Sequence, residues 1–453
     1  PIYVFFEKRT NFIMKYPVTI LSLLSISVGL FAQVPNMATM QSPAPEGTSL
    51  GANNTLSSSG IALGNRVKMR GFVDFRYDYS DLDGLATDEN GLTIDDDARF
   101  RTAADVDFLF DFSPVTGEVH LAATSDELGL EQAFLRYNFN QDFSLTAGRQ
   151  LTVLSYEKDE SPNMYQTSYA YLTDVSADVQ GGTSALESFI GLNSFKSTAS
   201  SIDSAMTGVP AYDSYAGTNP AVNPAGFPLP SFRRNYVDGI RANFNNGQFG
   251  LVAGLHNGYF TDNDNLNDGN IGLDIAASVM IIPGLELRLG FGYENNDDYD
   301  KSIAGYNTWA TDLRTALTNA GLTAEASQVP LFPKSDDISQ FNAWLSYQTG
   351  GLTLAMEWDM WDMYVIDMWN LMFLANYQFN DLFALTFRYS HEDFEADVQG
   401  GGEGDSNRFT IGPMFTITDF LTIGVEYSHA ELDSTITGET SVDELYAETI
   451  FSF

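Results

Sequence analysis

The chain has 453 residues, with 60 acidic against 22 basic side chains and a formal net charge of −38, yet 44% of it is hydrophobic and 13% is aromatic. Phosphate backbones require clustered Lys and Arg, so this acidic balance excludes a nucleic-acid partner. The chain contains no Cys, which excludes a disulfide framework and a cysteine nucleophile. Its aromatic content excludes disorder for most of the length.

The first predicted element is a targeting segment. Met14-Lys15 precedes an uncharged apolar run, Val18 to Phe31, which ends with the small residue Ala32. A basic start, a short apolar stretch and a small residue are typical of a secretory signal peptide. We expect residues 1–32 to be upstream residues plus this signal peptide, with the true start at Met14. Residues 33–65, rich in Ser, Ala, Gly, Asn and Pro, are expected to form a flexible periplasmic leader.

From residue 66 to the end, polar and apolar residues alternate with a period of two in sixteen segments, from 66–80 to 442–453. Tight turns such as Asn245-Asn246-Gly247 alternate with long loops such as 80–98 and 296–336. This pattern predicts an all-β fold, a transmembrane antiparallel β-barrel over residues 66–453 in the outer membrane of a Gram-negative cell. Sixteen strands are expected; two more within 168–195 would make 18, and a secreted soluble β protein is the alternative.

The third long connection, 156–235, is far longer than a surface loop needs. Its first part is rich in Tyr and acidic residues, so we expect 156–180 to fold into the lumen and constrict it. An entirely extracellular loop is the alternative. The constriction is predicted to carry these acids: Glu157, Asp159, Glu160, Asp174 and Asp178.

A sixteen-stranded barrel leaves a water-filled channel. Two adjacent segments place basic residues on the inward side of one arc of its wall: Arg66, Lys68, Arg70, Arg76, Arg99 and Arg101. A basic arc that faces an acidic loop would create a transverse field in the pore, which filters ions. Arg149 falls on the apolar side of its segment unless Gly148 marks a β-bulge.

The other chemistry-bearing residues give weaker signals. Asp262, Asp264 and Asp268 could bind Ca²⁺ through carboxylate oxygens, but they match no complete calcium loop, so hydrated surface is the favoured reading. His120 and His256 are expected to face inward, where a Ser-His-acid site would make a barrel hydrolase. We predict no enzymatic activity, no cofactor and no metal beyond this structural calcium alternative.

Several short motifs lie in a recognisable order. They are Gly148-Arg149-Gln150-Leu151, Leu154-Ser155-Tyr156-Glu157, Ser161-Pro162-Asn163-Met164-Tyr165, Val237-Asp238-Gly239-Ile240-Arg241, His256-Asn257-Gly258, Ala375-Asn376-Tyr377-Gln378-Phe379 and Arg388-Tyr389-Ser390-His391. Together they resemble the OmpL-like β-barrel porin family (β-barrel porin type 2), over roughly residues 66–453. The insertion around 176–232 departs from that family's pattern, which implies a shorter segment there. The resemblance implies a passive channel and not an energised transporter.

The sequence thus predicts an outer-membrane porin for passive diffusion of small hydrophilic solutes and ions, with a mild cation preference from its acidic loops. A plugged structural or adhesion barrel is the first alternative and the hydrolase the second. Expected partners are outer-membrane lipid, the permeating solutes and ions, and the barrel-assembly machinery. The last strand, which closes on Phe453, resembles the signal that this machinery reads. The oligomeric state stays open, with a homotrimer among the alternatives.

Overall fold

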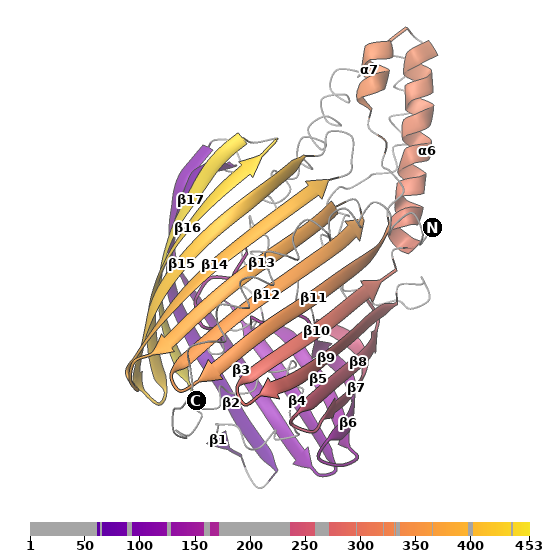
Figure 1. Ribbon diagram of the computed structural model, residues 1–453. Coiled ribbons are helices and arrows are strands. Elements are labelled where there is room, and N and C mark those ends of the chain that lie inside the picture. Colours follow the sequence, from indigo (N-terminus) through magenta and orange to yellow (C-terminus); the bar gives the residue numbers. More distant parts are fainter. Residues whose placement is uncertain are drawn as a thin grey trace. The chain divides into compact units, whose positions relative to one another are not determined.

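The structure is a computed structural model, and the part of the chain that it describes is almost entirely β (Figure 1). The described residues are 61–63, 66–87, 93–124, 128–157, 164–171, 236–258, 271–295, 297–319, 321–329, 331, 336–364, 366–396, 402–435 and 438–453. The predicted signal peptide and most of the predicted leader lie outside these ranges. The end of the leader is a two-residue strand, β1 (Ile61–Ala62), which pairs with β2.

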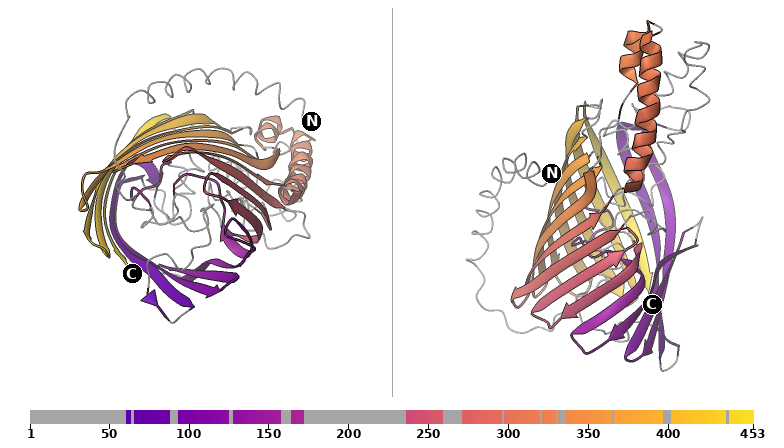
Figure 2. Two further views of the ribbon diagram at one scale, coloured as in Figure 1. Left: turned by 60° about the horizontal axis from the view of Figure 1, so that its bottom comes forward. Right: turned by 90° about the vertical axis from the view of Figure 1, so that its right-hand side faces the viewer.

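Sixteen further strands form one closed antiparallel barrel. They are β2 (Val67–Thr87), β3 (Thr93–Phe112), β4 (Val115–Ala123), β5 (Leu128–Asn138), β6 (Phe143–Leu151), β7 (Tyr236–Asn245), β8 (Phe249–His256), β9 (Gly272–Ile282), β10 (Leu285–Glu294), β11 (Asp336–Thr349), β12 (Leu352–Tyr364), β13 (Ile366–Gln378), β14 (Phe383–Ala396), β15 (Glu403–Thr418), β16 (Leu421–Ser434) and β17 (Gly438–Ser452). Each strand pairs with its neighbours in sequence, and β17 pairs with β2. Figure 2 shows these two strands side by side in the ring.

The predicted count of sixteen is confirmed, and the alternative of eighteen is wrong. β6 and β7 are hydrogen-bonded directly to each other from Phe143↔Phe244 to Leu151↔Tyr236. No strand therefore enters the barrel between them, whatever the conformation of the long connection that joins them. The predicted loop at 80–98 is shorter than expected. β2 and β3 extend into this range and pair there up to Thr87↔Thr93.

Alternation along each strand divides the barrel into an apolar outside and a polar inside. Phe100, Leu135 and Phe409 are among the most exposed apolar side chains, at 70%, 65% and 57%. Their strand neighbours of opposite parity, such as Arg136 and Arg408, point inward. An apolar exterior around a polar lumen is the arrangement of outer-membrane barrels, in which hydrocarbon contacts the outward face.

The predicted long connection 296–336 joins β10 to β11 as expected, but it contains two helices that were not predicted, α6 (Asp297–Asn319) and α7 (Thr323–Gln328). Figure 1 shows both beyond the ends of β10 and β11, opposite the tight turns. Leu313 and Leu317 on α6 are buried together with Ala326 and Val329. This spacing of three to four residues is the helical periodicity that the sequence already contained. No helix in the described ranges is long and apolar enough to cross a membrane.

Candidate functional site

The chain turns into the lumen immediately after β6. Arg288 of β10 donates from Nη2 to the carbonyl oxygen of Val153 at 2.6 Å, and Val153 and Leu154 are fully buried against the inner wall. Gly290 of β10 makes room for this segment, since a Cβ there would lie 2.2 Å from Cδ2 of Leu154. Ser155 has a φ of 102°, a backbone conformation that L-residues rarely adopt and that sharply redirects the chain.

Tyr156 fixes this first lumen segment to β11 and β12. Its backbone N–H donates to Oε1 of Glu357 at 2.7 Å, and its hydroxyl lies 3.3 Å from Oγ of Ser346. The ring makes an edge contact with Trp344, with centroids 5.4 Å apart. Burial, followed by the nearby Tyr165, raises the pKa of the Tyr156 phenol well above its ordinary value. The phenol is therefore protonated and neutral in the lumen.

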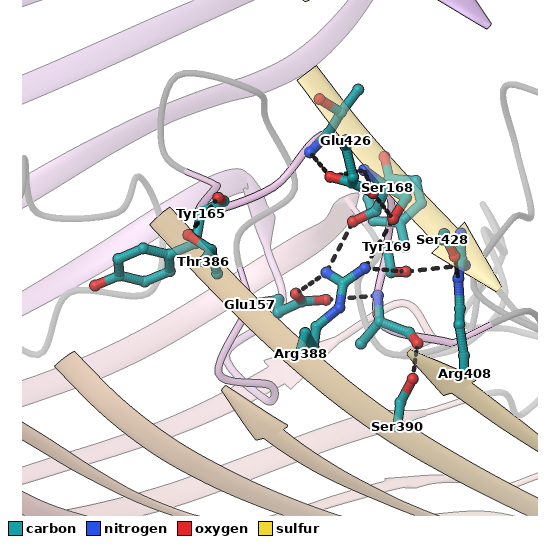
Figure 3. A network of polar contacts seen from close by, with 12 residues as sticks. Glu157, Tyr165, Ser168, Tyr169, Thr386, Arg388, Ser390, Arg408, Glu426 and Ser428 are labelled. Atoms are coloured by element: carbon teal, nitrogen blue, oxygen red, sulfur yellow. Dashed lines mark hydrogen bonds and ion pairs between the residues drawn. The ribbon is translucent and has the colours of Figure 1, made fainter. Parts of the chain in front are cut away.

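A second lumen segment, residues 164–171, lies along strands β14 to β17 (Figure 3). Its backbone donors bind carboxylates of the wall: Thr167 and Ser168 donate to Glu426 of β16, at 2.6 Å for Thr167. The Thr167 hydroxyl also donates to Oε2 of Glu448 on β17 at 2.9 Å. Backbone N–H groups buried away from water must find acceptors, and here the barrel wall supplies them.

The carbonyl oxygens of the same segment are bound by wall donors. Arg388 of β14 donates to the oxygens of Ser168 and Tyr169 at 2.8 and 2.7 Å, and Arg408 of β15 donates to Tyr169 at 3.1 Å. Ser390 of β14 donates to the oxygen of Ala170. Figure 3 shows the two guanidinium groups on either side of this stretch. This piece of chain is thus held at both its donors and its acceptors.

Glu157 joins the two lumen segments. One of its carboxylate oxygens accepts from Arg388, and the other accepts from the N–H of Ala170 at 2.8 Å. The Arg388 side chain is fully buried, and its charge is compensated by this carboxylate. We call the following set the loop latch: Glu157, Thr167, Ser168, Tyr169, Ala170, Arg388, Ser390, Arg408, Glu426 and Glu448.

A small apolar cluster lies beside the loop latch. Tyr171 and Ala170 of the lumen segment are fully buried and pack with Met372 and Leu374 of β13. Tyr156 and Trp344 belong to the same cluster. The lumen segment is therefore fixed by apolar packing as well as by polar contacts, and the wall from β10 to β17 contacts it along most of its described length.

The predicted basic residues lie on β2 and β3, next to β17 in the ring of strands. Arg70 of β2 binds Asp107 of β3, with Nε to Oδ2 at 2.8 Å. Arg76 and Arg101 face each other in register, and both bind Asp78, at 2.7 and 2.9 Å. The structure thus brings these arginines together on adjacent strands, but each is paired with a carboxylate of its own wall.

The remaining basic residues differ in their positions. Lys68 lies opposite Leu109, and Arg99 lies opposite Asp78, both with inward parity. Arg66 is at the turn end of the barrel, where its exposed guanidinium lies 5.4 Å from the ring centre of Phe112. It therefore belongs to the mouth of the barrel and not to the constriction.

Of the predicted constriction acids, Glu157 is the one that the structure describes. It faces Arg388, and not the basic arc of β2 and β3 as expected, because the lumen segment follows the wall from β10 to β17. Asp159, Glu160, Asp174 and Asp178 lie outside the described residues. So do the calcium candidates Asp262, Asp264 and Asp268.

The two inward histidines bind acids. Nδ1 of His120 lies 3.0 Å from Asp107, and its Nε2 lies 3.1 Å from Glu118. Nε2 of His256 lies 3.1 Å from Asp274, which also binds Arg241. Within the described ranges, no group of three or more His, Asp and Glu side chains is arranged to hold a metal ion. The expected absence of a cofactor stays a prediction.

The sequence analysis missed the most connected residues. Arg388 and Arg408 had the inward parity that marks a lumen residue, and Arg408 binds Glu444 of β17. Arg136 of β5, 3.8 Å from Glu118, was missed as well. Parity could have placed all three inside the barrel. The partners of Arg388 and Arg408 on residues 157–170 could not have been found in this way, because those contacts join segments more than 200 positions apart.

Arg149 points outward, as its strand parity suggested. Its Nη1 lies 3.7 Å from Oδ2 of Asp238 on the neighbouring strand β7, and both side chains are partly exposed. Gly148 has a φ of 129°, and a Cβ at this position would lie 2.3 Å from the backbone oxygen of Ala133. Glycine is required here because of this close approach, and the pairing register shows no shift at this point.

Comparison with known proteins supports the fold. No family model and no curated protein matches the sequence. The outer membrane channel DcaP of Acinetobacter baumannii has a similar structure, with a TM-score of 0.51, 11% identity, and coverage of 87% of this chain and 100% of that one. OmpF of Salmonella typhi, in complex with daunomycin, has a TM-score of 0.51, 13% identity, and coverage of 87% and 100%. OmpT, an outer membrane protein of Vibrio cholerae, reaches 0.46 at 11% identity, with the same coverage. This chain therefore has the β-barrel fold of outer-membrane porins.

Proposed function

We propose that this protein is an outer-membrane porin through which small hydrophilic solutes and ions diffuse passively. One observation carries the proposal: a polar chain segment is fixed inside a closed sixteen-stranded barrel, along the wall from β10 to β17. Inward arginines of the adjoining strands β2 and β3 keep partly exposed side chains. A barrel of this size leaves room for water, and a segment bound to one wall narrows the lumen without needing to fill it.

The finer features of the proposal come from the sequence. The order of the short motifs supports membership of the OmpL-like family, and the last strand, closing on Phe453, supports recognition by the barrel-assembly machinery. The predicted mild cation preference requires carboxylates that face the lumen water. Glu157 is bound by Arg388, so the preference would have to come from the other acidic residues of the loops. A homotrimer remains the proposed alternative to a single barrel.

Reconstitution of the purified protein in a planar lipid bilayer tests the proposal. We expect discrete open steps whose size scales with the KCl concentration, because a diffusion pore conducts in proportion to its ions. The reversal potential in a KCl gradient measures the preference between K⁺ and Cl⁻. A folded barrel that never opens would contradict the proposal and favour the plugged structural barrel.

A further inference from the structure

The first residues of β2 have a neighbour on both flanks. On one flank β3 pairs with β2 from Val67 onwards. On the other flank β17 pairs with β2 as far as Phe72, and Phe453 exchanges two backbone hydrogen bonds with Gly71. Val67 to Met69 lie beyond that point. Their backbone groups on this flank therefore need another partner.

The end of the leader is that partner. β1 runs antiparallel to β2 and begins with Ile61 opposite Met69. The N–H of Leu63 donates to the carbonyl oxygen of Val67 at 2.9 Å. Figure 1 shows β1 at the tight-turn end of the barrel, beside the start of β2 and near the C-terminus. Residues 61–63, which we call the leader strap, thus continue the line of β17 along β2.

The apolar side chains of the leader strap face outward. Residues directly opposite each other in an antiparallel pair point to the same side, and Met69 shares the parity of the outward residues Val73 and Phe75. Ile61 is 48% exposed and Leu63 is 52% exposed, against 39% and 46% for Val73 and Phe75. The leader strap therefore extends the outward apolar surface, which contacts hydrocarbon in an outer-membrane barrel.

The sequence explains why the leader pairs at this point. Ile61, Ala62 and Leu63 form a short apolar run between Gly60 and Gly64, at the end of a segment rich in Ser and Asn. Backbone groups of β2 that face hydrocarbon without a partner are costly, because no water is present to bind them. An apolar strand supplies these bonds and is itself compatible with the surrounding lipid.

We propose that the leader strap anchors the leader to the lipid-facing side of the barrel wall, with membrane lipid as the partner of Ile61 and Leu63. The strap satisfies the backbone at the start of β2 and keeps the attachment point of the leader outside the lumen. This inference goes beyond the proposed function, since it concerns a segment that the permeating solute does not meet.

Paired cysteines test the position of the leader strap, because the chain contains no other Cys. Opposite residues of an antiparallel pair have Cα atoms about 4.5–5.5 Å apart, which a disulfide can bridge. We expect I61C/M69C to form an intramolecular disulfide when the folded barrel is oxidised in lipid vesicles. I61C/V73C is the matched control and should not, because Val73 lies four residues, or about 13 Å, further along the same face. No disulfide in folded I61C/M69C, or an equal yield in I61C/V73C, would overturn the pairing.

Single spin labels test the contact with lipid. A nitroxide at I61C or L63C should collide more often with O₂, which concentrates in hydrocarbon, than with a water-soluble nickel chelate. V73C should behave in the same way, and T311C on the exposed side of α6 should show the opposite order. If the labels at positions 61 and 63 resemble the label at T311C, the lipid contact is refuted.

A proline substitution tests what the leader strap does for β2. L63P removes the N–H that donates to Val67, whereas L63A keeps this donor and shortens the side chain. We expect amide hydrogen exchange of residues 66–71 to become about tenfold faster in L63P, as loss of one backbone hydrogen bond permits, and to change little in L63A. The main conductance should stay that of the wild type in both variants. Unchanged exchange in L63P would overturn the support of β2, and an altered conductance would overturn the attachment outside the lumen.

Discussion

Two stretches of the lumen wall use the same residue types for different purposes. On β14 and β15, Arg388 and Arg408 are buried, and they bind backbone carbonyl oxygens of the lumen segment. On β2 and β3, Arg76 and Arg101 both bind Asp78, and their side chains stay partly exposed to the lumen. Strand parity makes all four inward. The role of each arginine depends on the path of the lumen segment and not on the strand that carries it. An arginine that the segment covers stabilises the segment, and one that it leaves uncovered stays accessible from the lumen.

The largest effect is expected from the replacement of Arg388, because this side chain holds the lumen segment against the wall. In R388M the carboxylate of Glu157 stays buried without its cation, the carbonyl oxygen of Ser168 loses its bond from Arg388, and that of Tyr169 keeps only the bond from Arg408. Breaking such a buried pair costs about 3–5 kcal/mol. We expect a lower unfolding midpoint in urea and a larger, noisier single-channel conductance, because the lumen segment is released. R149M should change neither measurement strongly. An unchanged conductance in a folded R388M barrel would show that the loop latch does not narrow the pore.

Neutralising Glu426 should weaken the loop latch without opening it fully. In E426Q one oxygen still accepts from the backbone of Thr167 and Ser168, but one acceptor and the charge are lost. Loss of a hydrogen bond to a charged group costs about 1.5–3 kcal/mol. We expect a modest loss of stability in urea and more frequent current fluctuations at an unchanged main conductance. A stability equal to that of the wild type would argue that these contacts are not formed in the membrane.

The smallest effect is expected at Tyr156. Y156F removes a hydroxyl that lies 3.3 Å from Oγ of Ser346 but keeps the ring beside Trp344. Its net contribution is expected to be about 1 kcal/mol. We expect a small shift of the unfolding midpoint and the wild-type conductance. Since the phenol is neutral, the conductance of the wild type should also show no titration step at the ordinary tyrosine pKa. A step that disappears in Y156F would contradict this burial.

The architecture could be predicted from the sequence because one physical rule acts at every strand. Hydrocarbon outside and water inside impose period two, and the first predicted segment, 66–80, begins one residue before β2. The sequence analysis missed α6 because it extended the alternation of tight turns and long loops across 296–336. Ala310, Leu313 and Leu317 nevertheless have the three- and four-residue spacing of a helix. The apolar side of a helix outside the membrane follows a different rule from that of the strands.

The candidate site was predicted only in its components. The basic arc and a loop that folds inward were both expected, and the structure places a described part of that loop, residues 164–171, in the lumen. The partner of Glu157 was expected among Arg66 to Arg101 and is Arg388. Parity states which side of the wall a residue faces, but not its angle around the barrel axis relative to a loop. That angle follows from packing, such as the contact of Leu154 with the space beside Gly290.

The pairing of β17 with β2 has a consequence for how the molecule is built. Ten register pairs, from Asp443↔Asp81 to Ser452↔Phe72, join the last strand to the first long one, and Phe453 exchanges two backbone hydrogen bonds with Gly71. Until this seam forms, both strands have open edges with unpaired backbone groups, which invite association with other chains. The seam joins the most distant parts of the barrel sequence, so its formation is expected to be slow. Closure is therefore the step at which an assembling chain is most exposed to aggregation, and shielding of these two edges is what an assembly factor would have to provide.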